Sequence, residues 1–263
     1  MLAACARPDP STDTDTDTSA PDIGFLADSF DLEDIGWLSE QADEFGVDLE
    51  VSGLRAIDKD AAFLFGGVRV HAGTIRSFLL ETRDGGKSWH ETMPPVLGSE
   101  LTHVAFADPQ HGWALAQWAV EQAGPIRLFG STDGGKTWRE LGDFPGDGFA
   151  VSMTFTSALQ GEIELSHDIE STTDDNREEI DTFASEDGGL TWSRIRRETR
   201  AGSPVATPAH RERGFDGSEW ELETRGFGDP IGIRRFDREQ SRRRVTTMPT
   251  HFRYEQGRVL TSP

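Results

Sequence analysis

The sequence has little cysteine and tyrosine, no long apolar run and no metal-binding histidine pattern. A single cysteine, Cys5, among 263 residues excludes an internal disulfide, so the fold must be stable by packing alone. No apolar run approaches the about 18 residues that a spanning helix needs, so we expect no membrane-spanning segment in this chain. The only tyrosine is Tyr254, and the seven histidines lack an H-E-x-x-H or other metal-binding spacing. The sequence therefore predicts no metal site and no cofactor.

Positive charge is also scarce. The chain has 26 Lys and Arg against 47 Asp and Glu, a net charge of -21, so we expect no nucleic-acid partner, because phosphates would be repelled. Bases are concentrated in residues 191–263, which hold 15 of the 26. Two interpretations of the crowded arginines stay open: a solvated hairpin tip paired with nearby acids, which the sequence favours, and a site for an anionic partner. These arginines are Arg234, Arg235, Arg238, Arg242, Arg243 and Arg244.

One short motif is present three times. Residues 82–89, 131–138 and 185–192 all follow the pattern [S/T]-x-D-G-G-x-[S/T]-W, and their aspartates are 49 and 54 positions apart. Such spacing is typical of a repeat fold with about 50 residues per unit. The copies supply six candidate structural residues, which are Asp84, Trp89, Asp133, Trp138, Asp187 and Trp192.

The residue types of this motif suit a tight hairpin. Two glycines accept positive φ without a Cβ clash, and the aspartate can accept hydrogen bonds from backbone N–H groups two residues on. The tryptophan can lie across the hairpin and bury roughly 150 to 250 Å² at its outer edge. Because each aspartate has local donors, we interpret the motif as a structural staple rather than as a set of ligands or catalytic acids.

The three copies resemble the Asp-box, or BNR, repeats of β-propellers such as sialidases and sortilin-type receptors. Residues 106–116 (F-A-D-P-Q-H-G-W-A-L-A) are similar to a stretch of the propellers related to the photosystem II stability and assembly factor. The resemblance covers about residues 50 to 250 and implies an all-β fold of four-stranded blades. It implies little about activity, because the Asp box occurs in enzymes and binding proteins alike.

Turn signals divide the chain into short runs rich in β-branched and aromatic residues. Three complete blades and a degenerate fourth are predicted, the fourth with its first strand near Pro204 and with Arg242 where the box tryptophan should stand. Segments 251–255 and 258–261 resemble two further strands, and 23–27 and 36–40 two more, so we predict a fifth blade shared between the chain ends. The blade strands are expected at 51–57, 62–68, 77–82 and 88–92; 101–106, 112–118, 126–131 and 137–141; 150–156, 161–166, 181–185 and 191–196; and 218–224, 231–236 and 243–248.

The N-terminal segment differs in composition from the rest. Residues 2–5 (L-A-A-C) are similar to a bacterial lipobox, which implies lipidation of Cys5. Residues 8–21 are Asp, Thr, Ser and Pro with one alanine, and cannot form a core. We therefore divide the chain into a lipobox-like start with a disordered tether (1–21) and a propeller domain (22–263). This predicts a lipid-anchored protein of the bacterial cell envelope, outside the cytoplasm, with a secreted protein as the alternative.

No enzymatic constellation stands out. Sialidases of this fold use a tyrosine nucleophile with a glutamate, but Tyr254 and Glu255 are adjacent in a predicted strand and point to opposite faces. His111 lies in a predicted turn, and the acidic loop 168–179 lacks the glycine spacing of calcium loops. The sequence assigns no catalytic residue and favours a role without catalysis.

The predicted function is a tethered extracytoplasmic protein-interaction or assembly module; a glycan-binding or sialidase-like hydrolase propeller is the alternative. We expect a monomer whose partner, protein or glycan, the sequence does not identify. Asp boxes occupy one face of a propeller, whereas ligands usually bind the other face. Trp118, Arg69 and Arg76 lie in connections on that other face, and are the candidate binding residues.

Overall fold

The computed structural model describes residues 46–71, 73–118, 125–168, 177–201, 211–223, 230–236, 242–248, 250–255 and 258–261. In these ranges the chain forms β-strands joined by turns. No helix within them is long and apolar enough to cross a membrane. The lipobox-like start, Cys5, the tether and the segments 23–27 and 36–40 lie outside the described residues.

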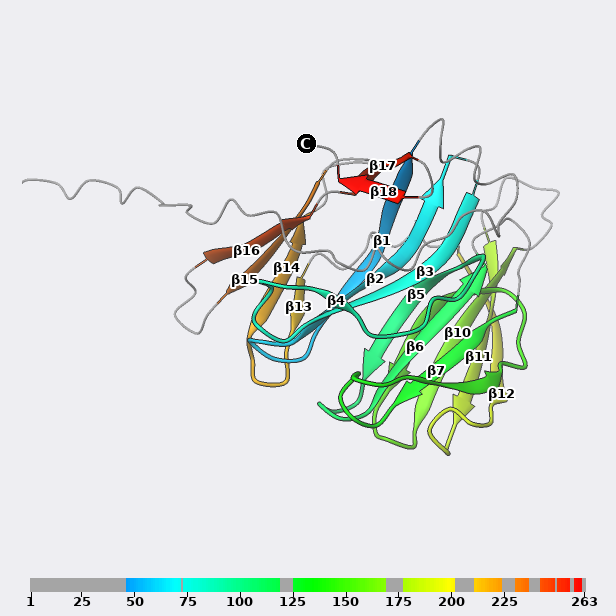
Figure 1. Cartoon of the computed structure of the whole chain (residues 1–263). Helices are drawn as coiled ribbons and strands as arrows, with labels where there is room; N and C mark the ends of the chain where they lie inside the picture. The colour runs from blue at the N-terminus through cyan, green and yellow to red at the C-terminus, as the bar shows by residue number, and fades with distance from the viewer. Residues whose placement is uncertain are drawn as a thin grey trace, which may run out of the picture.

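The strands form four antiparallel sheets (Figure 1). We call them blades 1 to 4 in chain order. Blade 1 contains β1 (Val47–Ala56), β2 (Ala62–Val70), β3 (Gly73–Thr82) and β4 (His90–Glu91), and blade 2 contains β5 (Ser99–Phe106), β6 (Gly112–Trp118), β7 (Arg127–Ser131) and β8 (Arg139–Asp143). Blade 3 contains β9 (Phe149–Phe155), β10 (Gly161–Asp168), β11 (Arg177–Ser185) and β12 (Ser193–Ala201), and blade 4 contains β13 (Arg211–Arg213), β14 (Glu219–Glu223), β15 (Ile231–Phe236) and β16 (Arg242–Met248).

Side-chain alternation explains how each sheet faces its neighbours. In β14 the sequence E-W-E-L-E buries Trp220 and Leu222 on one face, while the three glutamates point to the other. In β2, by contrast, every residue but Arg69 is buried, because blade 1 is covered on both faces. Strand patterning therefore distinguishes a blade inside the assembly from a blade at its end.

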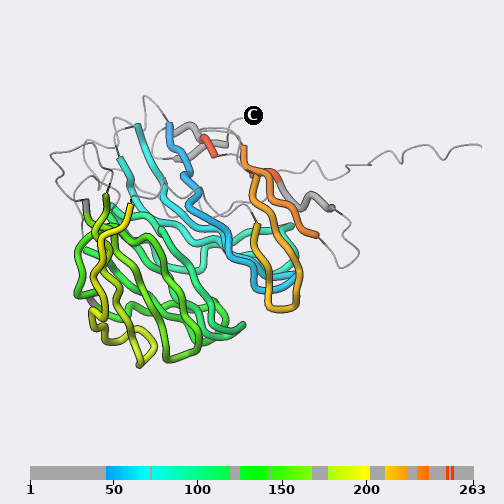
Figure 2. The backbone as a smooth tube through the Cα atoms, turned by 180° about the vertical axis from the view of Figure 1, so that it is seen from behind, coloured from blue at the N-terminus to red at the C-terminus, as the bar shows by residue number. Residues whose placement is uncertain are grey.

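Three apolar clusters join the blades in the spatial order 4, 1, 2, 3. Trp220 and Ile233 of blade 4 pack against blade 1, blade 1 packs against blade 2 around Phe63, and blade 2 packs against blade 3 around Trp113. Figures 1 and 2 show this row from opposite sides, with the orange blade 4 beside the blue and cyan blade 1. The first strands β1, β5, β9 and β13 contact one another and line the inner side of the row.

The outward faces of the two end blades are polar. On blade 3, Glu164 pairs with Arg196 and Arg200, and on blade 4, Arg234 pairs with Glu221 and Glu223. Mixed acid and base ladders of this kind keep a sheet face in water, as terminal repeats of repeat proteins do. In the described part of the chain, the blades thus form an arc with a charged face at each end.

The predicted fold class, an all-β propeller built of four-stranded blades, is confirmed, but the predicted number of five blades is not. The C-terminal strands β17 (His251–Glu255) and β18 (Arg258–Thr261) form at the predicted positions, yet they extend blade 1. The reason is that β1 begins earlier than predicted, so Val47 and Asp48 are free to pair with Phe252 and His251. The first strand of blade 4 begins at Arg211, later than the position predicted near Pro204.

Candidate interaction face

Each Asp box is a hairpin held by its own hydrogen bonds. Asp84 accepts bonds from the backbone N–H groups of Lys87 (2.9 Å) and Ser88 (3.0 Å) and from the Ser88 hydroxyl (2.6 Å), and Gly86 N–H donates to the Thr82 hydroxyl. The donors lie three and four residues beyond the aspartate, rather than two as expected from the sequence. Asp187 has the same three bonds, Asp133 has the two from the N–H and hydroxyl of Thr137, and both glycines of every box have positive φ.

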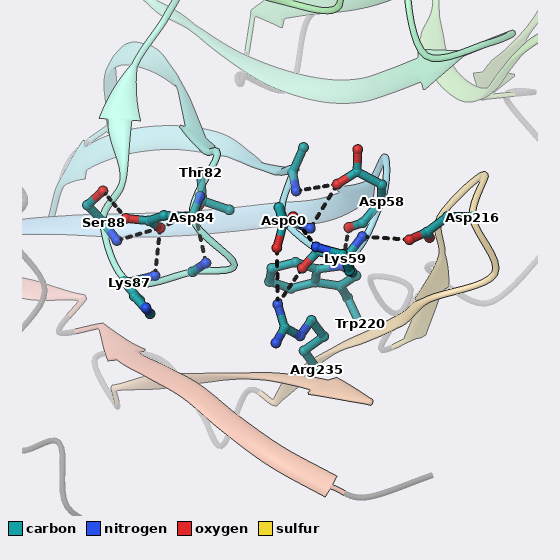
Figure 3. Close-up of polar contacts among 12 residues, drawn as sticks. Asp58, Lys59, Asp60, Thr82, Asp84, Lys87, Ser88, Asp216, Trp220 and Arg235 are labelled. Carbon is teal, nitrogen blue, oxygen red and sulfur yellow. Dashed lines mark hydrogen bonds and ion pairs between the residues drawn. The ribbon is translucent and has the colours of Figure 1, made fainter. Parts of the chain in front are cut away.

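The box hairpins also fix the turn between the first two strands of their own blade. Gly85, Gly134 and Gly188 donate to the carbonyl oxygens of Asp60, Gln110 and Leu159. Figure 3 shows the first of these turns, Asp58 to Asp60, between the box of blade 1 and the residues Asp216, Trp220 and Arg235 of blade 4. There Asp216 accepts a bond from Lys59 N–H, and the Trp220 indole donates to Asp58 O. The carboxylates of the box aspartates and of Asp216 thus accept hydrogen bonds from neighbouring donors. These bonds give the carboxylates a structural role.

The box tryptophans pack between blades rather than across the outer edge of their own hairpins. Trp138 of blade 2 lies edge-on to Phe63 of blade 1, with ring centroids 6.2 Å apart, and its indole donates to Gly135 O. Trp192 packs against Phe144 and Phe155 in the same way, and Trp89 is fully buried in the cluster shared with blade 4. The motif is therefore an inter-blade seal as well as a hairpin staple.

Large apolar side chains are also exposed at the ends of the sheets that lie away from the Asp boxes. Leu97 is 69% exposed, Trp118 48% and Phe149 37%. Ser99 pairs with Trp118, so the start of β5 and the end of β6 lie together. The Gln117 amide bonds to both Gly148 and Ala150, which brings the start of β9 to the same place. Leu97, Trp118 and Phe149 define what we call the interaction face, because exposed apolar groups gathered in one place commonly mark binding surfaces.

The other two candidate residues of this region have internal partners. Arg69 is half-exposed and pairs with Glu50 of the neighbouring strand. Arg76 is 1% exposed and pairs with Glu91 at 2.5 Å, because the register of β2 with β3 places it opposite Val68 in the apolar interface with blade 4. Trp118 alone among the three candidates presents a largely open side chain.

A second acid, Glu100, lies beside Glu50 at this face and carried no signal in the sequence. A Cβ on Gly67 would lie 2.9 Å from the Cβ of Glu100, so the Glu100 side chain rests directly on the β2 backbone. Burial raises the pKa of Glu100, the charge of Glu50 raises it further, and Arg69 lowers it. Glu50, Glu100 and Arg69 thus form a charge cluster between blades 1 and 2.

A separate polar group forms on the inner strands. Arg55 of β1 donates to Val104 O of β5 and pairs with Glu212 of β13 at 2.9 Å. Burial raises the pKa of Glu212, and Arg55 opposes this effect. His103 of β5 is half-buried, and its partial removal from water lowers its pKa. Three blades therefore contribute an arginine, a carboxyl and an imidazole to the inner side of the arc.

The remaining candidate residues from the sequence make only ordinary structural contacts or lie outside the described residues. His111 bonds to Asp108 at 2.9 Å within its turn, and Arg235 bonds to Lys59 O. Tyr254 belongs to β17, opposite Val259. Most of the acidic loop 168–179 is not described. Within the described ranges, no group of three His, Cys, Asp or Glu side chains is placed to hold a metal ion.

Comparisons with known proteins add a likeness of fold. No family profile matches the chain, and no curated protein matches it. Among solved structures it resembles the GH74 xyloglucanase from Xanthomonas campestris, with 17% identity, a TM-score of 0.34, and coverage of 73% of this chain and 28% of that one. A GH93 α-L-arabinofuranosidase of Fusarium graminearum has 11% identity and a TM-score of 0.39 over 81% and 68% of the chains. A Hadza microbial sialidase has 13% identity and a TM-score of 0.40 over 80% and 48%.

These enzymes are propellers of the Asp-box type, and the chain shares their four-stranded antiparallel sheets. The chain spans about a quarter of the xyloglucanase and about half of the sialidase. Sequence identities this low indicate a similar fold and do not indicate a shared activity.

Proposed function

We propose that the chain is a protein-interaction or assembly module that binds its partner through the interaction face. The observation that carries this proposal is the gathering of Leu97, Trp118 and Phe149, all exposed, at neighbouring strand ends away from the Asp boxes. Tryptophan is over-represented among residues that dominate binding energy, and it needs an apolar surround to do so. The resemblance of residues 106–116 to assembly-factor propellers agrees with such a role.

The charge around this face favours a basic partner. Asp147 is exposed two residues before Phe149, and Glu100 lies three residues after Leu97. β10 ends and β11 begins at the same side of the sheets, where Asp168 lies opposite Glu178 and is followed across the ladder by Glu179. A polypeptide that presents apolar side chains among lysines or arginines matches this surface.

A matched pair of exposed apolar residues tests the proposal. Trp118→Ala should reduce capture of the partner from the native membrane fraction at least about tenfold, as expected for a hot-spot residue. Leu190, which is 53% exposed on an Asp-box hairpin, provides the control, and Leu190→Ala should leave the captured proteins unchanged. Equal capture by both variants, or loss with Leu190→Ala alone, would refute the assignment of the binding face.

Glycan binding or glycoside hydrolysis is the second candidate. Arg55, Glu212 and His103 favour it, because an arginine beside a carboxyl of raised pKa on the inner strands is the kind of arrangement that binds and protonates a sugar. Hydrolysis of a panel of fluorogenic glycosides, abolished by Glu212→Gln, would support it. Absence of turnover and of glycan binding would leave the interaction module as the function.

The location proposed for this module is the cell envelope, with Cys5 lipidated and residues 8–21 as the tether, and a secreted protein is the alternative. The acidic, Thr-rich composition of this segment supports a solvated spacer. Labelling with a clickable fatty acid should tag the protein, and Cys5→Ser should abolish the label and release the protein from membranes. Unchanged membrane association of Cys5→Ser would exclude the lipid anchor.

A further inference from the structure

One buried polar side chain, Gln117, holds the backbone on both sides of Phe149. Gln117 is 3% exposed and lies near the end of β6. Its amide nitrogen donates to Gly148 O, and its amide oxygen accepts a hydrogen bond from Ala150 N–H at 3.1 Å. These two backbone groups flank Phe149, which is exposed on the interaction face. The amide of Gln117 therefore fixes the position of an exposed aromatic residue through its neighbours in the chain.

The start of β9 is also held from the side of β10. Phe149 lies opposite Ser166 in the ladder between these strands. Gly148 has a φ of 119°, and a Cβ on it would lie 2.8 Å from Ser166 O and 2.9 Å from Cε1 of His167. Because only glycine combines this φ with such a close approach, the chain before Phe149 passes directly over β10. Phe149 therefore begins β9 between β10 and the Gln117 amide.

The equivalent position in blade 1 shows that a blade does not need this amide. Gln117 is four residues after Trp113, and Gly67 is four residues after Phe63, the aromatic residue that packs blade 1 on blade 2. Gly67 has no side chain, and Glu100 of blade 2 rests on its backbone. A buried amide lowers stability unless its donor and acceptor are both bonded. Gln117 therefore serves the connection that carries Phe149 rather than the general architecture of a blade.

We propose that Gln117 is a positioning residue of the interaction face, which holds Phe149 in the conformation that binds the partner. This inference rests on the proposed function and adds to it a buried residue that orders the face before binding. A side chain and loop that are ordered in advance are not immobilised on association, which is typically worth about twofold to tenfold in affinity. Because Trp118 follows Gln117 directly, the end of β6 supplies one contact residue and positions another.

The first test observes Phe149 itself, in the full chain with para-fluorophenylalanine at position 149. Gln117→Met keeps the length of the side chain but loses both hydrogen bonds. The original chain should give one narrow fluorine NMR line. Gln117→Met should split this line or broaden it at least about twofold, because exchange between conformations on the μs–ms timescale broadens a signal. The same label at Phe215, which is 50% exposed on blade 4, should give an unchanged line in both chains.

The second test measures capture of the partner from the native membrane fraction through benzoylphenylalanine at position 118. With Gln117→Met, the concentration of chain that gives half-maximal adduct should rise about twofold to tenfold, since Phe149 must then be ordered on binding. In a chain that already carries Phe149→Ala, adding Gln117→Met should have no further effect. Trp220→Phe, which also removes one buried donor, provides the control and should leave the line at position 149 and the capture unchanged.

Three results would overturn the positioning role of Gln117. These are an unchanged fluorine line at position 149 in Gln117→Met, unchanged half-maximal capture, and a loss of capture that is equally large when Phe149→Ala is already present. The third result would mean that Gln117 acts on binding by a route other than Phe149. No adduct from position 118 in the original chain would instead refute the proposed function, whatever the fluorine spectrum shows.

Discussion

At the scale of single residues, the box aspartates are carboxylates held in the charged form by their own hairpins. The pKa of Asp133 is lowered to about 2, chiefly by the hydrogen bond from the Thr137 hydroxyl and then by that from Thr137 N–H. Since this pKa lies below its ordinary value, the carboxylate stabilises the folded state at neutral pH. That stabilisation is present above about pH 4 and is lost as the pH falls toward 2.

Asp133→Asn should lower the free energy of unfolding at pH 7 by about 1 to 2 kcal/mol, because the amide accepts weaker bonds than the carboxylate. The difference from the original protein should disappear as the pH is lowered through the window from 4 to 2. Urea unfolding at several pH values measures both effects. A variant that is fully stable but has lost partner binding would identify Asp133 as a functional acid.

Two tryptophans allow a comparison of packing. Trp138→Ala should cost about 3 kcal/mol, in the range for a truncated aromatic in a core, because its ring packs against Phe63 and Phe106. Trp118→Ala should cost under about 1 kcal/mol, since its side chain is half in water already. Thermal unfolding followed by calorimetry would contradict this if the two losses were equal.

The residues that the sequence could indicate are those with local partners. The bonds of Asp84 are made within its own motif, so spacing predicts their donors to within one or two positions. Glu100 lies against the backbone of Gly67 through the contact of β5 with β2, and nothing near Glu100 in the sequence marks that contact. Arg76 was predicted at the surface, but the register of its strand buries it.

At the scale of elements, the second strands of blades 4, 1 and 2 each offer an aromatic residue to the next blade in the row. Trp220 donates to Asp58 O of blade 1, Phe63 packs on Gly135 of blade 2, and Trp113 donates to Gly188 O of blade 3. In blade 3 the equivalent position is Glu162, which is exposed. The row therefore ends at blade 3 because a charged residue replaces the bridging ring.

In the original protein the ring centroids of Trp113 and Phe155 are 3.6 Å apart, and the Trp113 indole donates a hydrogen bond to Gly188 O. Trp113→Phe keeps a ring that can stack on Phe155 but removes this donor. We expect a loss of about 1 kcal/mol and faster amide exchange in blade 3 than in blade 1. Trp220→Phe is the matched control at the other interface, and should loosen blade 4 instead. Hydrogen exchange that rises uniformly in both variants would contradict a blade-by-blade bridge.

Most strands could be predicted, since β14 follows period-two patterning and β2 and β6 are short, mostly apolar runs between clear turns. β13 has three residues and charged side chains, so no apolar pattern marks it. The partner of β17 was not predictable either. Pairing with β1 depends on which strand edge is free, which is a property of the assembled blades.

At the scale of the whole molecule, the chain is a row of blades whose C-terminus returns to β1. His251 pairs with Asp48 at 2.8 Å, and the Leu49 N–H donates to Thr250 O. The C-terminal hairpin thereby covers the beginning of the β1 edge, which would otherwise offer unpaired backbone groups.

Deleting residues 250–263 should lower the melting temperature of the domain and increase self-association, because it uncovers that edge. His251→Ala, which loses the contact with the Asp48 carboxylate but keeps both strands, should remain monomeric. Calorimetry and analytical ultracentrifugation measure the two effects. A truncated chain that melts like the full chain and stays monomeric would show that the hairpin does not protect β1.

The central claim is that this acidic arc binds a basic polypeptide at the face of Leu97, Trp118 and Phe149. Site-specific photocrosslinking tests it most directly, with benzoylphenylalanine at position 118 and, as the control, at position 190 on an Asp-box hairpin. We predict one dominant adduct from position 118 in the native membrane fraction, mapped by mass spectrometry to a peptide with basic residues among apolar ones, and no such adduct from position 190. The same adducts from both positions, or a dominant adduct from position 190 alone, would contradict the claim.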